Sequence, residues 1–214
     1  MRQVASSCIL LLAVASSLVS AATQSKARIL PYAANQSIVR RLLPGDDTVV
    51  VQRDVEPIVS ERRPSAREFV SQLLVGDQPL SVIVADITRV EGQLVDDDRW
   101  IHSRFEGRVV RALRQPRSAA RPILRKGDAV TFSVDGGAVR IGTVLVKTDN
   151  AVAFPTDRRY LLFIGAPDEL TGKPLAKTLP VLVEGEKLRV GGEANSLLTA
   201  LSLTEVSKIV RSVR

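Results

Sequence analysis

Hydrophobic and polar positions alternate along much of the chain, and the longest alternation runs from residue 99 to residue 114. Its odd positions carry large apolar side chains that we expect to point into a core: Ile101, Phe105, Val109 and Leu113. Its even positions carry aromatic and charged side chains that we expect to point outward: Trp100, His102, Arg104, Glu106 and Arg108. Two adjacent valines at 109–110 break the alternation, which predicts a β-bulge.

Similar patterns predict further strands at 48–52, 81–91, 129–134, 139–146, 158–164, 181–183 and 188–190. In the 158–164 strand, Tyr160, Leu162 and Ile164 share one face, and Leu161 and Phe163 share the other. The triplet Asp135-Gly136-Gly137 predicts a tight turn, so we expect 129–134 and 139–146 to pair as one hairpin. The stretch from Gly165 to Pro180 is predicted to be a loop.

Two helices are predicted by capping boxes, in which a serine and a glutamate three residues later satisfy free backbone amides. Ser65 and Glu68 form the first pattern, followed by apolar residues at helical spacing and by Gly76. Ser202 and Glu205 form the second, close to the end of the chain.

The order is therefore helix, six or seven strands, helix. Because no helix separates successive strands, we expect a mainly β fold, either an antiparallel OB-like barrel or a small sandwich. The predicted divisions are a signal peptide at 1–22, an extended N-terminal arm with one strand at 23–60, a helix-plus-barrel domain at 61–190, and a C-terminal helix at 191–214 packed on that domain.

The first 22 residues have the pattern of a secretory leader: Arg2, an apolar run from Ile9 to Ala15, and small residues up to Ala22. We expect export to a periplasmic or extracellular location, with a retained N-terminal anchor as the alternative. Cys8 lies within the leader, directly before the apolar run, so cleavage would leave a mature chain without cysteine or disulfides.

Four stretches carry a resemblance to a family. They are Val82–Ile87, Asp98–Ile101, Gly127–Gly137 and Tyr160–Phe163. Between about residues 69 and 190 the chain resembles a group of exported bacterial proteins of unknown function. The resemblance implies a small OB-like barrel and brings no activity with it. The basic loop at 115–125 departs from that pattern.

Charge adds a candidate surface to this outline. The formal net charge is +7, and removal of Arg2 with the leader would leave +6 (7 − 1). A positive balance favours anionic partners. Aromatic residues make up only 4% of the chain, which disfavours a nucleic-acid surface built on many stacking rings.

The predicted binding face combines the outward residues of the long strand with the arginines that follow it. Its members are Trp100, His102, Arg104, Arg108, Arg114, Arg117, Arg121 and Arg125. Guanidinium groups suit phosphate, sulfate and carboxylate. We therefore expect a non-enzymatic binding module for an anionic envelope polysaccharide or a partner protein, with nucleic acid disfavoured by export.

The sequence offers few residues for catalysis or metal binding. His102 is the only histidine and is expected to point outward, so a Ser-His-Asp triad has no clear base. No cofactor or transition-metal site is expected, and Asp96-Asp97-Asp98 lacks the spacing of a calcium loop. Two alternatives stay open: a small hydrolase built on carboxylates, and a structural or assembly protein that pairs through the N-terminal arm and a sheet edge.

Overall fold

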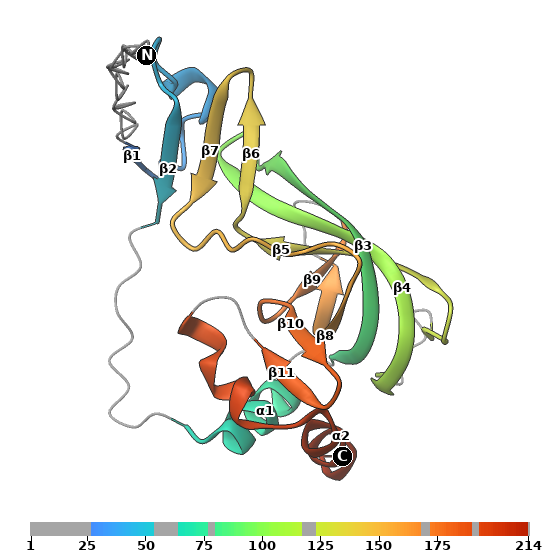
Figure 1. Ribbon diagram of the computed structural model, residues 1–214. Coiled ribbons are helices and arrows are strands. Elements are labelled where there is room, and N and C mark those ends of the chain that lie inside the picture. The colour runs from blue at the N-terminus through green and yellow to red at the C-terminus, as the bar shows by residue number, and fades with distance from the viewer. Residues whose placement is uncertain are drawn as a thin grey trace, which may run out of the picture.

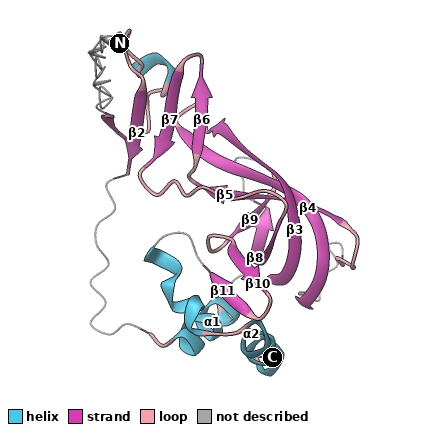
Figure 2. Ribbon diagram, viewed as in Figure 1, coloured by secondary structure: helices cyan, strands magenta, loops and turns pink. Residues whose placement is uncertain are grey.

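The computed structural model describes residues 27–53, 64–76, 80–116, 123–167, 172–189 and 193–213. These residues form eleven strands in two sheets, two α-helices and two 3-10 helices (Figures 1 and 2). The strands are β1 (Arg28–Pro31), β2 (Thr48–Gln52), β3 (Ser81–Val95), β4 (Trp100–Arg114), β5 (Ala129–Asp135), β6 (Ala138–Ile141), β7 (Val144–Thr148), β8 (Arg158–Pro167), β9 (Pro174–Ala176), β10 (Val181–Glu184) and β11 (Lys187–Arg189). The helices are η1 (Val39–Arg41), α1 (Ala66–Val75), η2 (Glu193–Ala200) and α2 (Leu203–Ser212).

The predicted mainly β fold is confirmed, with more strands than the six or seven expected. The larger sheet has the order β11-β10-β8-β3-β4-β5-β9, and β9 also pairs with β8. Strands β8, β3, β4, β5 and β9 therefore close into a ring of pairings. The closing strand β9 lies inside the stretch that was predicted to be a loop, so that prediction was wrong there. Because β9 has only three residues, no periodic pattern could reveal it.

The described residues form three apolar cores, which pack against the two sheets. One lies between the outer face of the larger sheet and the helices α1, η2 and α2, which gather at the C-terminal end of the molecule in Figure 2. A second fills the ring, and a third lies between the smaller sheet and the tip of the β3–β4 hairpin. Strand β8 serves two cores as predicted: Tyr160, Leu162 and Ile164 enter the ring, while Leu161 and Phe163 face the helices.

The predicted bulge in β4 is confirmed. Val84 pairs with Arg111, whereas Ala85 pairs with Val109, so Val110 is the extra residue. The insertion changes which side chains face the ring. Val109 belongs to the core inside the ring, but Val110 and Leu113 pack against the core under the helices. Leu113 therefore faces a different core from Phe105, although both had been placed on one inward face.

The predicted pairing of 129–134 with 139–146 is wrong. Strand β5 pairs with β4 and β9, whereas β6 and β7 pair with each other in the smaller sheet. The chain leaves the ring at Gly136 and Gly137, whose φ angles are 87° and 138°. Gly142, with a φ of 60°, then makes the turn inside the stretch that had been read as one strand. Glycine adopts such angles without a steric penalty, which permits both reversals.

The described part of the N-terminal arm is folded into the smaller sheet, whose order is β1-β2-β7-β6. Strand β1 pairs in parallel with β2, and β2 pairs in parallel with β7. Arg28 holds the crossover between the two arm strands by a two-pronged contact with Asp46, at 2.8 and 2.6 Å. Leu30, Ile38, Val49 and Val51 are buried in the third core.

Both predicted helices and both capping boxes are confirmed. The Ser65 hydroxyl accepts the Glu68 amide, and the Glu68 carboxylate accepts the Ser65 amide at the start of α1. Ser202 and Glu205 make the same reciprocal pair at the start of α2. Among the described helices, none combines the length and apolar character needed to cross a membrane.

The two sheets meet where β6 crosses β3 at Gly92. A Cβ atom on Gly92 would lie 1.7 Å from the carbonyl oxygen of Ala138, so any side chain would force the backbones apart. We expect Gly92→Ala to lower the free energy of unfolding by about 1–3 kcal/mol, the usual cost of overpacking a fixed site. Urea unfolding followed by circular dichroism measures the change.

Gly76→Ala is the matched control, because a Cβ there would meet its nearest atoms at 3.7 Å. That substitution should leave the urea midpoint almost unchanged. Equal midpoints for Gly92→Ala and the parent protein would contradict a tight crossing at this point.

Candidate functional site

The even positions of β4 do share one outer face, as the alternation predicted. Phe105 and Val109 fill the ring, so Arg104, Glu106 and Arg108 lie on the opposite side of the strand. The structure brings the first two members of the predicted face, Trp100 and His102, to the same side but buries them. They were expected to be exposed, whereas Trp100 is 2% exposed and His102 is 4% exposed.

Segments far away in the sequence cover Trp100. The Tyr32 ring meets it edge-on, with ring centroids 5.5 Å apart and planes at 88°. The Arg53 guanidinium lies over its face, 3.9 Å from the ring centroid. Tyr32 follows β1 and Arg53 follows β2, so the burial of Trp100 depends on the smaller sheet. Alternation within β4 contains no signal for this cover, which explains why the exposure was predicted wrongly.

Asp135, the last residue of β5, joins these side chains. Its Oδ1 accepts the Trp100 indole N–H at 2.5 Å and lies 3.3 Å from His102 Nε2, while Oδ2 lies 3.3 Å from an Arg53 nitrogen. Burial acts to raise the pKa of Asp135, but the hydrogen bonds from His102 and Trp100 and the charge of Arg53 outweigh it. The pKa of this carboxyl therefore lies below its ordinary value, and the group stays ionised at neutral pH.

Most arginines on the outer face are paired with carboxylates. Arg104 contacts Glu106 at 2.7 Å, and Arg89 contacts Glu91 at 2.8 Å. In the register of the sheet, Glu91 lies opposite Arg104, and Arg89 lies opposite Glu106. The centre of this face is therefore a ladder of alternating charges. Opposite charges across a ladder stabilise strand pairing and leave little net charge to attract an anion.

The remaining predicted members that the structure describes differ in their surroundings. Arg108 is exposed and donates to the Gly127 carbonyl at 3.2 Å, and Arg114 is partly buried at the end of β4. Arg125 is exposed, and its backbone N–H donates to Asp128 at 2.6 Å. Arg117 and Arg121 lie outside the described residues. Of the six predicted residues that the structure describes, Trp100 and His102 are buried, whereas Arg104, Arg108, Arg114 and Arg125 are partly or fully exposed, so these six do not form one exposed surface.

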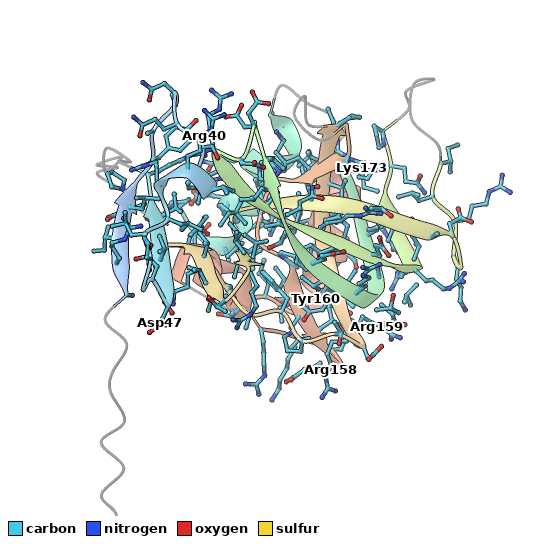
Figure 3. The ribbon with its side chains drawn as sticks, turned by 90° about the horizontal axis from the view of Figure 1, so that it is seen from above. Arg40, Asp47, Arg158, Arg159, Tyr160 and Lys173 are labelled. Atoms are coloured by element: carbon cyan, nitrogen blue, oxygen red, sulfur yellow. The ribbon has the colours of Figure 1, made fainter. Side chains whose placement is uncertain are left out.

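A different basic cluster lies where β3 pairs with β4 on one side and with β8 on the other. Asp86 on β3 lies opposite Arg108 on one side and Arg159 on the other. Arg159 binds Asp86 through two contacts at 2.8 and 3.1 Å, and the hydrogen bond raises the pKa of Arg159 further. Arg158 and Arg111 lie beside this group, and Figure 3 shows Arg158 and Arg159 at the same edge of the molecule.

These side chains line a surface hollow of about 600 Å3, which we call the basic hollow. Its cationic lining is Arg111, Arg158 and Arg159. Its apolar lining is Val84, Val110, Val183 and Leu203. Its acidic lining is Asp86, Asp157 and Glu186. The hydrophobic pattern does not predict this cluster, because it places Arg158 and Arg159 simply at the start of a strand. The adjacent pair of arginines before an apolar run was the available signal.

Two of the three acidic groups are already engaged. Asp86 is held by Arg159, and the Glu186 carboxylate accepts both the backbone N–H of Thr204 at 3.1 Å and its hydroxyl at 2.8 Å. Among the described residues, Arg111 and Arg158 form no ion pair. The hollow therefore presents two guanidinium groups that remain available to an anion.

The carboxylates of β3, β4 and the turn between them, from which a hydrolase could be built, do not form a buried pair in the part of the chain that the structure describes. Asp86, Glu91 and Glu106 each contact an arginine. Asp96 is bound by Arg99 at 2.5 Å, and the side chain of Asp97 is 97% exposed. A carboxyl that serves as a general acid usually lies in a buried site, and none of the carboxylates named above is buried.

Within the described residues, no group of three His, Cys, Asp or Glu side chains has a geometry suited to a metal ion. No protein-family model matches the chain, and no curated protein sequence matches it either. The resemblance to exported OB-like proteins therefore stays a prediction.

The lowered pKa of Asp135 makes the Trp100 environment sensitive to acid. A carboxyl with a depressed folded-state pKa stabilises the fold at pH values above its unfolded pKa of about 3.9. This contribution is lost as the pH falls through the lower folded-state pKa. We expect the Trp100 emission to be constant from pH 7 to about pH 4 and to change below it.

Because Trp100 is the only tryptophan, its emission reports this site alone. Asp135→Asn keeps the shape of the side chain and removes the charge, so its emission should no longer respond to acid in that range. An unaltered acid response in Asp135→Asn would mean that a different group controls the environment of Trp100.

Proposed function

We propose that the protein is an exported, non-enzymatic binding module that recognises an anionic polymer of the cell envelope through the basic hollow. The observation that carries this proposal is the position of Arg111 and Arg158. Both line the hollow, both are exposed, and neither forms an ion pair among the described residues. Export rests on the leader pattern at 1–22, which lies outside the described residues.

The electrostatics favour the hollow over the centre of the outer face. Arg104 and Arg89 are compensated by carboxylates, so an anion there would compete with existing contacts. Of the three arginines of the hollow, Arg159 alone is paired with a carboxylate among the described residues. Guanidinium groups bind sulfate, phosphate and carboxylate through paired N–H donors, which gives geometric selectivity as well as attraction.

The apolar lining favours a polymer with repeating rings over a small inorganic anion. Val84 is on β3, between β4 and β8 in the sheet, and Val110 on β4 and Val183 on β10 line the same hollow. A sugar ring can pack its apolar face on such side chains while its acidic substituents reach the guanidinium groups. The burial of Trp100 removes the aromatic platform that the sequence had suggested, so stacking of bases has no support at this site.

The test is titration of the mature chain with polyuronate, sulfated glycan, polyphosphate and oligonucleotide, followed by calorimetry at two salt concentrations. We expect saturable binding of an acidic glycan that weakens with salt, because exposed charges are screened. Arg111→Gln combined with Arg158→Gln should weaken binding by about tenfold or more, since charge-assisted hydrogen bonds contribute about 1.5–3 kcal/mol each.

Arg89→Gln is the matched control, because Arg89 is exposed on the outer face of the same sheet but lies outside the hollow. It should leave the affinity within about twofold. Equal losses in the control and the double variant would indicate general attraction by net charge. Absence of saturable binding to any of the polymers at low salt would contradict the proposed function.

A further inference from the structure

The side chains around Arg53 have the composition of a cation-binding cage. Tyr32 and Trp100 present two rings at right angles, with centroids 5.5 Å apart. The guanidinium carbon of Arg53 lies 3.9 Å from the Trp100 centroid and 5.2 Å from the Tyr32 centroid. The Asp135 carboxylate lies beside the guanidinium group, 3.3 Å from the nearest Arg53 nitrogen. We call this group of Tyr32, Trp100 and Asp135 the Arg53 cage.

Aromatic faces attract cations through their quadrupoles, and a planar guanidinium stacks best on the indole of tryptophan. The cage therefore has the parts needed to recognise an arginine side chain: one ring to stack on, one ring beside it, and one carboxylate. All three come from the ends of different strands. Tyr32 is set beside the end of β2 because its backbone N–H donates to the Gln52 carbonyl at 2.7 Å.

Arg53 is held less firmly than two other paired arginines of the chain. Arg28 binds Asp46 through contacts at 2.8 and 2.6 Å, and Arg159 binds Asp86 through contacts at 2.8 and 3.1 Å. Arg53 makes one contact with Asp135, at 3.3 Å. The Arg53 side chain is 39% exposed and that of Asp135 is 45% exposed, so solvent reaches both partners.

We propose that the Arg53 cage is a guanidinium-recognition site that the chain occupies with its own Arg53, and that an arginine side chain of a partner protein can replace it. Arg53 acts as an intramolecular ligand. The apparent affinity for an external arginine is the affinity of the open cage multiplied by the fraction of molecules in which Arg53 has left it. This site takes a cation and lies against the smaller sheet, so it is independent of the basic hollow.

The test uses Arg53→Ala in the mature chain, with N-acetyl-arginine methylamide as the probe and Trp100 emission as the readout. We expect the variant to show a more solvent-exposed emission than the parent protein. Added probe should change that emission saturably. Because a stacking contact and an exposed ion pair together hold Arg53 only moderately, the parent protein should bind the probe about tenfold more weakly.

N-acetyl-lysine methylamide at equal ionic strength tests the ligand class, because an ammonium lacks the planar stacking surface. Equal binding of both probes would overturn the assignment to guanidinium. Arg53→Ala combined with Asp135→Asn should lose binding, since the carboxylate is removed while the rings remain. Arg159→Ala removes an arginine that is paired with a carboxylate far from the cage, so it should leave Trp100 emission and probe binding at the parent level.

Circular dichroism and thermal unfolding establish that Arg53→Ala is folded. If it is not, Arg53→Gln keeps the aliphatic stem and removes the charge, and the same titration applies. A folded variant of either kind that binds the probe no more tightly than the parent protein would overturn the proposal. So would an Arg53→Ala protein whose Trp100 emission is unchanged, because Arg53 would then not be what covers the ring.

Discussion

Two 15-residue strands, β3 and β4, contribute side chains to all three cores, and the rest of the structure depends on this shared hairpin. Val84 faces the helices, Phe105 fills the ring, and Trp100 lies under the smaller sheet. A single hairpin can serve three cores only if its faces change along its length. The bulge at Val110 changes which side chains of β4 face the ring, and the close crossing at Gly92 lets the smaller sheet pack on the end of the hairpin. The hairpin therefore couples the arm, the ring and the helices, which are far apart in the sequence.

Local signals in the sequence were sufficient wherever the determinant was also local. The two capping boxes, the two-faced pattern of β8 and the paired valines of the bulge all act within a few residues. The ring closure by β9 and the separation of β5 from β6 are different, because they depend on contacts formed after the chain has folded back on itself. Three residues of β9 carry no period, and Gly136 permits either a tight turn or an exit from the sheet.

The candidate site also combines local and long-range determinants. Alternation placed Trp100 and Arg104 on one face of β4, and the structure keeps them there. It could not indicate that Tyr32 and Arg53 cover the first while the second remains at the surface. Burial of a strand residue depends on what packs above it, and these two residues come from the ends of β1 and β2. The side of a strand is thus a local property, whereas its exposure is a property of the tertiary structure.

Counting arginines along β4 also overstated the positive charge of its face, because the compensating carboxylates come from the neighbouring strand as well as from β4. Glu91 and Asp86 on β3 reduce the field over the centre of the sheet, whereas Arg111 and Arg158 in the basic hollow have no ion pair among the described residues. Arg53 has the opposite relation to its surroundings, since it is the cation that an aromatic and acidic cage binds. Salt should affect binding at these two kinds of arginine differently. Attraction at the exposed hollow is screened within about 8–10 Å at ordinary ionic strength, whereas stacking on a buried indole depends mainly on contact and persists.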